Sequence, residues 1–227
     1  MDFQQIKTGK NNYTIITDDI INNIACIQAF KDHKMNSKLQ KHHKDLLRYA
    51  KNKNNSKEIG LFWDLNNVDK EPLKIKGQIN GFSINDKPEV SSLVKNTHNI
   101  LTVVMMHNHP RNGLFSGADI RSFIDFNSIY LMTAVCNDGT IYMLRKEINF
   151  NPLLMEKYYN DGVAMSKKAV QAERLRKAKK LKLDINNIND NDKISKIQTK
   201  PYYFGIKNVA KHAKEIGITY RCSVRRK

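Results

Sequence analysis

A nearly unbroken apolar run, NILTVVMM at residues 99–106, places the strongest constraint on the fold of this chain. A strand that is apolar at successive positions, rather than at alternate ones, is buried on both faces. The run ends in HNHP (107–110), and a short loop with Gly113 reverses the chain. The following segment, SGADIRSFIDFN (116–127), has the apolar spacing of a helix. We therefore predict a buried strand, a loop and a helix in this order.

Further strands are predicted on both sides of this unit. EIGLFWDL (58–65) is rich in apolar and aromatic residues, and KIKGQINGFSI (74–84) alternates in places, as a half-buried strand does. SIYLMTAVC and TIYMLRK flank Asn137-Asp138-Gly139, which is a strong hairpin signal. These elements predict a compact α/β domain over residues 55–150.

The flanking regions are predicted to be helical extensions. In the N-terminal segment, residues 1–54, Thr17 or Asp18 can cap a helix through TDDIINNIACIQAF, and a second helix starts near Asn36. The second helix carries one buried stripe, formed by Leu39, His43, Leu46, Leu47 and Ala50.

The C-terminal extension, residues 151–227, reads as basic and mainly helical. Its first part is one helix or two, interrupted near Asp161-Gly162, and a polar linker follows at residues 184–196. VAKHAKEIG then ends at a glycine, as a helix does.

Positive charge is concentrated in this extension. The chain carries a net charge of +17, and residues 151–227 hold 19 Lys and Arg against 7 Asp and Glu. Such an excess can attract nucleic acid or another polyanion. Equally, it can be a solvated helix face, or reflect a coding bias toward Asn and Lys. The candidate contact residues are Arg174, Arg176, Lys177, Lys179 and Lys180.

Two absences narrow the class of protein. No apolar run approaches the roughly 20 residues of a membrane span, and the N-terminus lacks the apolar core of a signal peptide. Cys26, Cys136 and Cys222 are far apart, which argues against a disulfide framework and a Cys-x-x-Cys zinc site. We expect a soluble, cytoplasmic protein.

The HNHP segment has the spacing of a metal site. Side chains at positions i and i+2 of a strand lie on the same face, so His107 and His109 can share one ion. Ser116 can cap the next helix, and Asp119 in its first turn faces back toward the histidines. Two imidazoles and a carboxylate suit Zn²⁺ with an open fourth position. Taken singly, His-x-His at a strand end and Ser-x-x-Asp at a helix start are ordinary structural features; their joint spacing is far more specific.

Over residues 56–147 this pattern resembles the JAMM (JAB/MPN+) metalloproteases, whose signature is an upstream Glu, His-x-His-Pro and Ser-x-x-Asp. The resemblance implies a JAB/MPN-like core, which is a mixed β-sheet flanked by helices, with His107, His109 and Asp119 as zinc ligands. It also implies that Ser116 helps to hold the tetrahedral intermediate and that a glutamate relays the proton. Glu58 is the best candidate for that glutamate. Glu71, in a Pro-containing loop, and Glu89, at the start of a surface helix, are weaker ones.

The implied activity is zinc-dependent cleavage of a peptide or isopeptide bond, with a protein or a modifier conjugate as substrate. The HNHP form is also similar to RadC-like proteins, although the loop before Ser116 is shorter and their helix-hairpin-helix region is not evident. Phe115-Ser116 looks more like JAB domains of bacterial and phage-associated proteins. The alternative function is therefore a RadC-like, DNA-associated accessory protein with an ancillary metal site. The oligomeric state stays open.

Overall fold

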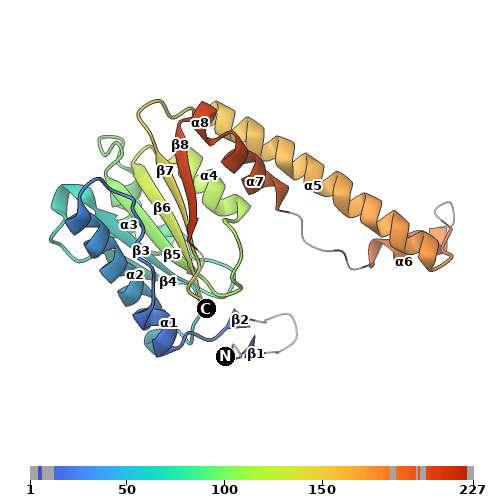
Figure 1. Cartoon of the computed structure of the whole chain (residues 1–227), viewed down its shortest axis with the longest axis horizontal. Coiled ribbons are helices and arrows are strands. Elements are labelled where there is room, and N and C mark those ends of the chain that lie inside the picture. The colour runs from blue at the N-terminus through green and yellow to red at the C-terminus, as the bar shows by residue number, and fades with distance from the viewer. Residues whose placement is uncertain (1–4, 7–12, 185–187, 198, 200–202, 224–227) are drawn as a thin grey trace. The chain divides into compact units, whose positions relative to one another are not determined.

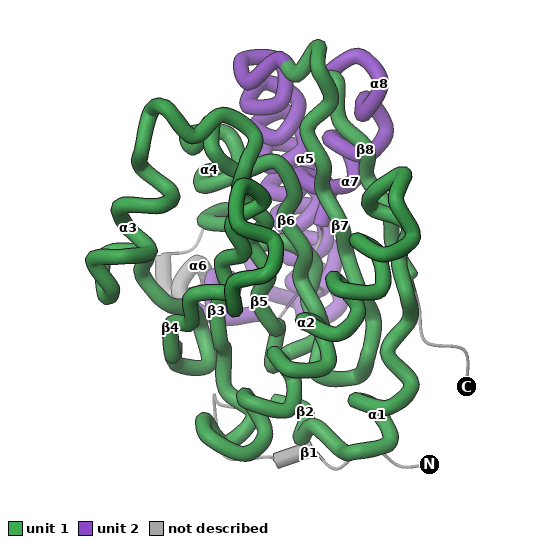
Figure 2. Tube along the Cα trace, turned by 90° about the vertical axis from the view of Figure 1, so that its left-hand side faces the viewer, with its two compact units in different colours: residues 1–150, 217–227 green, residues 151–216 purple. Residues whose placement is uncertain are grey.

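The computed structural model of the chain describes residues 5–6, 13–184, 188–197, 199 and 203–223. The chain divides into two compact units (Figure 2). Unit 1 consists of residues 1–150 and 217–227, and unit 2 of residues 151–216.

Unit 1 is built on a mixed six-stranded β-sheet (Figure 1). The strand order is β4–β3–β5–β6–β7–β8, in which β5 and β6 are parallel and all other neighbours are antiparallel. The strands are β3 (Ile59–Asp64), β4 (Leu73–Lys76), β5 (Val103–His109), β6 (Ile129–Cys136), β7 (Ile141–Lys146) and β8 (Ile218–Ser223). This sheet and the helices around it confirm the predicted α/β class.

The helices of unit 1 lie on both faces of this sheet (Figure 1). They are α1 (Asp18–Asn22), α2 (His33–Lys53), α3 (Pro88–Lys95) and α4 (Gly117–Asp125). Unit 1 also contains two short 3₁₀ helices, η1 (Leu65–Asn67) and η2 (Ile84–Asp86). Two short strands, β1 (Gln5–Ile6) and β2 (Tyr13–Thr14), pair with each other. Val104 and Met106 of β5 join the core beneath α1 and α2. His107 and His109, one residue out of phase, therefore lie on the opposite face, where α4 crosses over from β5 to β6.

The predicted stripe of α2 is buried in this core. Leu39, Leu46, Leu47 and Ala50 are all fully buried, and they pack in one cluster with Trp63 of β3. His43 is buried as well, and its Nε2 lies 2.9 Å from the Thr133 hydroxyl of β6.

The first predicted helix is much shorter than its isoleucine spacing indicated. Thr17 caps α1 as expected, but the helix ends at Asn22, and Ile24 and Ile27 are buried from an irregular segment. The reason is competition from side chains for the backbone. The Asn36 carboxamide accepts hydrogen bonds from the backbone N–H of Ala29 and Phe30, at 2.9 and 2.8 Å, and this holds the segment out of a helix.

The hairpin prediction is confirmed: β6 and β7 pair across the Asn137-Asp138-Gly139 turn, where Gly139 has a positive φ of 90°. The strand predicted over residues 74–84 is reduced to β4. A tight turn follows it at residues 78–81, where Gln78 N–H donates to the Gly81 carbonyl at 2.9 Å.

Unit 2 is helical, with α5 (Pro152–Lys180), α6 (Ile188–Ser195), α7 (Phe204–Lys211) and α8 (Ala213–Ile216). The first is one uninterrupted helix, so Gly162 does not break it. A Cβ at Gly162 would clash with the Phe204 carbonyl oxygen, and the glycine therefore permits close packing of α5 on α7. The predicted polar linker contains α6; its residues 185–187 lie outside the described residues.

The domain division differs from the predicted one at both ends. Only the boundary after residue 150 coincides. Residues 1–54 belong to the same unit as the sheet, because residues 16–50, which include α1 and α2, supply about half of its main core. At the other end, β8 leaves the helical extension and adds an edge strand to β7, so residues 151–227 are not one extension.

Candidate metal centre

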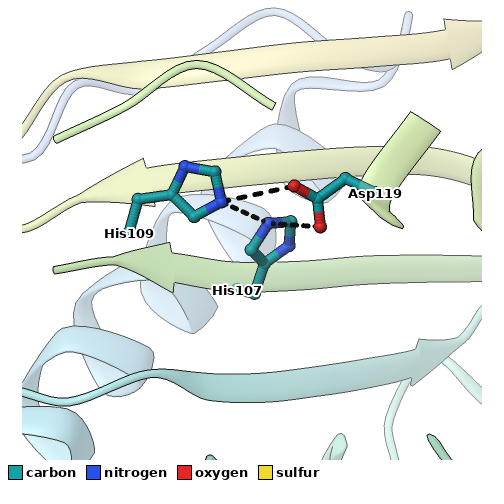
Figure 3. A group of neighbouring side chains, drawn as sticks. All are labelled: His107, His109 and Asp119. Carbon is teal, nitrogen blue, oxygen red and sulfur yellow. Dashed lines mark hydrogen bonds and ion pairs between the residues drawn. The ribbon is translucent and has the colours of Figure 1, made fainter. Parts of the chain in front are cut away.

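Three potential metal ligands converge where β5 ends and α4 begins (Figure 3). The Nε2 atoms of His107 and His109 are 2.9 Å apart. The Asp119 carboxylate lies 3.3 Å from His107 Nε2 through Oδ1 and 3.5 Å from His109 Nε2 through Oδ2. All three residues are buried or nearly so, with His107 fully enclosed. This cluster could hold a metal ion.

The surrounding backbone fixes the orientation of these ligands. A carbonyl oxygen only accepts hydrogen bonds, so the contact of 2.7 Å between His109 Nδ1 and the Gly113 carbonyl places a proton on Nδ1. The neutral His109 ring then presents the lone pair of Nε2 to the cluster. Ser116 N–H donates to Asp119 Oδ2 at 2.6 Å, and Asp119 N–H donates to Ser116 Oγ at 3.2 Å. This capping box holds the carboxylate at the start of α4.

The electrostatics show that the cluster favours positive charge between its donors. Burial opposes ionisation of Asp119, but the two histidines outweigh it and hold the pKa of that carboxyl well below its usual range. Burial likewise works to lower the pKa of His109, whereas the Asp119 carboxylate raises it above the ordinary value. A proton or a metal ion can supply this charge.

Glu58 lies beside the cluster, one residue before β3. Glu58 is only 7% exposed. Burial raises the pKa of its carboxyl to about 7, although the charges of His107 and His109 act to lower this pKa. A carboxyl with this pKa can accept and release a proton near neutral pH.

A cleft of about 570 Å³ opens onto the cluster. Glu58, His109, Ser116 and Asp119 line it, together with residues of the loops at 79–85 and 110–114. The metal ligands, the glutamate and the serine predicted from sequence are therefore brought together at one accessible cavity.

One contributor to this site could not be predicted from the sequence. The Gly113 carbonyl orients His109, but a backbone acceptor has no residue-type signal. The glycine in the loop was the only available hint. It does not need its special conformational freedom, because its φ is not positive.

The predicted polyanion contacts form no comparable cluster. All five lie on α5, where Arg176, Lys179 and Lys180 are exposed and the other two are half-buried. Lys177 forms an ion pair of 2.8 Å with Glu173.

Comparison with protein-family models, curated proteins and solved structures gave no match. Within the described part of the chain, no helix is long and apolar enough to cross a membrane. The fold and the site thus define a mixed α/β protein with a buried group of two histidines and one carboxylate beside a cleft.

Proposed function

We propose that this protein is a zinc-dependent hydrolase of the JAMM type that cleaves a peptide or isopeptide bond. The observation that carries the proposal is the convergence of His107, His109 and Asp119 beside a cleft that Glu58 also lines. The sequence resemblance predicts the same four residues.

The donor atoms fit zinc. A tetrahedral Zn²⁺ with bonds of about 2.0–2.1 Å needs donor atoms roughly 3.3 Å apart. In the cluster the two imidazole nitrogens are 2.9 Å apart, and His107 Nε2 and His109 Nε2 lie 3.3 and 3.5 Å from different oxygens of the Asp119 carboxylate. With one donor atom from each residue, all three ligands lie within 4.8 Å of one another. Three protein ligands of the N, N, O type leave one position free, as in catalytic rather than structural zinc sites. When bound, such an ion supplies Lewis acidity, which lowers the pKa of water to about 7 and polarises a carbonyl group.

Glu58 would act as the general base and then as the general acid. Its carboxylate takes a proton from the attacking water and returns it to the nitrogen of the leaving amine. The pKa of about 7 suits both steps at neutral pH. The burial of Glu58 keeps this exchange away from most of the bulk water.

Ser116 would stabilise the negative charge that develops on the carbonyl oxygen. Its Oγ already accepts the Asp119 N–H, which leaves the hydroxyl hydrogen available to donate. The residue is exposed and lines the cleft, so a substrate carbonyl can reach it.

The decisive experiment compares Glu58→Gln with Glu71→Gln and Glu89→Gln, the two exposed alternatives. The probes are a library of α-linked peptides and a library of lysine-ε-linked isopeptides, with cleavage followed by mass spectrometry. We expect Glu58→Gln to retain zinc and lose hydrolysis of whichever library the wild type cleaves, while the other two variants stay active. Full activity of Glu58→Gln would show that another residue is the base.

A second candidate function rests on unit 2. Arg176, Lys179 and Lys180 are exposed within the last two turns of α5, where they could contact the phosphates of a nucleic acid. The protein would then be a DNA-associated accessory factor with an ancillary metal site. Cations near a helix C-terminus also interact favourably with the helix dipole, so their presence alone does not require a partner.

A further inference from the structure

The position of Glu58 relative to the metal ligands depends on how β3 is joined to β5. The backbone ladder between these strands ends with the pair Gly60 and His107. Continuing this register would place Glu58 opposite His109, two residues farther along. On its other side, Glu58 is held by the backbone beyond β4: its N–H donates to the Gln78 carbonyl and its carbonyl accepts from Gly77 N–H. On the side of β5, a further link is needed.

The Asn108 side chain provides this link. Its Oδ1 accepts a hydrogen bond from Ile59 N–H at 2.7 Å, and its Nδ2 donates to the Lys57 carbonyl at 3.2 Å. These two backbone groups flank Glu58 directly. Asn108 is fully buried and lies between the two histidines in sequence, but it points to the opposite face of β5.

A second buried carboxamide fixes the orientation of the first. Asn108 Nδ2 also donates to Asn137 Oδ1 at 2.7 Å. Asn137 Nδ2 in turn donates to the carbonyls of Thr14 and Ser56, both at 2.8 Å, and its backbone N–H donates to the His109 carbonyl at 3.2 Å. Because every donor and acceptor of Asn108 is used, rotating its amide by 180° would leave buried groups unpaired.

We propose that Asn108 is a positioning residue that holds Glu58 in register with the metal ligands. In the HNHP segment, the two histidines would then bind the metal ion on one face of β5, while the asparagine between them holds the backbone of the general base from the other face. The catalytic consequence rests on the proposed function. The link itself, from Asn108 to the backbone on both sides of Glu58, does not.

The test compares Asn108→Ala with a matched variant, Asn36→Ala. Asn36 is also buried, and its side chain also makes two hydrogen bonds to the backbone, in this case by accepting from two N–H groups; it lies at the start of α2 and does not line the cleft. Both variants should lower the melting temperature. Both should bind zinc stoichiometrically, since the three ligands are unchanged.

Only Asn108→Ala should displace the Glu58 carboxylate and so lower the rate of hydrolysis. We expect its kcat to fall by about 10- to 100-fold with KM almost unchanged, as for other residues that orient a catalytic group. Asn36→Ala should keep the kcat of the wild type. Equal losses of kcat in the two variants would overturn the proposal, because they would show that Asn108 contributes only stability.

A measurement that needs neither substrate nor metal tests the Asn108 link independently of the hydrolase function. Hydrogen exchange of the Ile59 amide should accelerate in Asn108→Ala and stay slow in Asn36→Ala. If Asn108→Ala fails to fold, Asn108→Asp replaces it as the test variant. Aspartate preserves the volume and the acceptor for Ile59 N–H but has no N–H donor for the Lys57 carbonyl. The Ile59 amide should then stay protected from exchange, while kcat falls. A protein without hydrolase activity but with this exchange pattern would remove the proposed function and leave the link in place. Unchanged exchange at Ile59 in Asn108→Ala would refute the link whatever the activity.

Discussion

The metal cluster of unit 1 and the basic end of α5 in unit 2 are the two features that the sequence marks as functional, and they differ in how the fold treats them. His107 and Asp119 come from different elements, are 12 positions apart in sequence and meet at 3.3 Å. Arg176, Lys179 and Lys180 are neighbours on one helix and exposed to solvent. Convergence of buried polar groups requires a tertiary arrangement that offsets their desolvation, whereas a run of charge on a helix requires none. The first kind of feature is therefore stronger evidence of function.

The largest expected effect is loss of the metal on removal of one ligand. His107→Ala should reduce zinc content from one equivalent to background, with an affinity loss well above the about 10- to 100-fold that follows removal of a supporting residue. Metal analysis of the purified protein after dialysis measures this directly. His98→Ala, at an exposed histidine of the same unit, serves as the control and should keep its zinc.

A zinc-free wild type under the same conditions would contradict the whole metal assignment. The cluster would then hold a proton between its imidazoles and the carboxylate. It would differ from the basic end of α5 only in being buried.

The next effect separates the two roles of Ser116. Ser116→Gly should lower the hydrolysis rate by roughly 10²–10³, the usual cost of losing an oxyanion donor. Its cost in stability should be only a few tenths of a kcal/mol, because glycine is tolerated as an N-cap. Ser116→Ala, which lacks both functions, should additionally lose about 1 kcal/mol of unfolding free energy. Rates that are unaffected in Ser116→Gly would reduce Ser116 to a helix cap.

The parts of the fold that were predicted correctly are those that a local sequence pattern determines. The apolar run of β5, the stripe of α2 and the Asn137-Asp138-Gly139 turn each depend on period or local backbone geometry. The convergence of His107, His109 and Asp119 followed from the period of two along β5 and from the first turn of α4. Each of these inferences involves residues close together in the chain.

The errors arose where neither hydrophobic period nor local turn geometry decides the structure. Asn36 holds Ala29 and Phe30 outside a helix, although the isoleucine spacing favoured one. β8 was missed because an edge strand buries little: of its six residues only Ile218 is buried, so the segment lacks a clear pattern. The link from Asn108 to the backbone around Glu58 spans 49 positions or more and has no local signature.

A third prediction tests how strictly the interior of unit 1 excludes charge. Burial, with a smaller contribution from the charge of His42, lowers the pKa of His43 from 6.5 to about 3. Between these pH values the unfolded chain binds a proton that the native protein does not, so stability falls as the pH is lowered through this window. From pH 6.5 to pH 4 the loss attributable to His43 should be about 3 kcal/mol.

Urea unfolding of the wild type and His43→Gln across this pH range measures the effect. Glutamine can still bond to the Thr133 hydroxyl but does not titrate, so the variant should show a flatter pH dependence. His98→Gln, at an exposed position, should follow the wild type. Parallel curves for all three proteins would show that His43 becomes protonated within the fold.

The smallest effect is expected at the basic end of α5. Replacing Arg176, Lys179 and Lys180 together by Gln should leave zinc binding and hydrolysis unchanged. If the helix contacts nucleic acid, the slope of log affinity against log salt for a DNA duplex should become shallower by up to about 2.7, because each lost phosphate contact accounts for about 0.9. Fluorescence anisotropy at several salt concentrations gives this slope.

A variant with the same change in net charge isolates the role of position. Lys31, Lys34 and Lys70 are exposed in unit 1, and their joint replacement by Gln removes three charges elsewhere. A specific interface on α5 requires the slope to change in the α5 variant and to stay the same in this one. Equal changes would indicate attraction by the net charge of +17 alone. A wild type that does not bind DNA even at low salt would end the case for a nucleic-acid partner, and the basic residues of α5 would then be a solvated helix face.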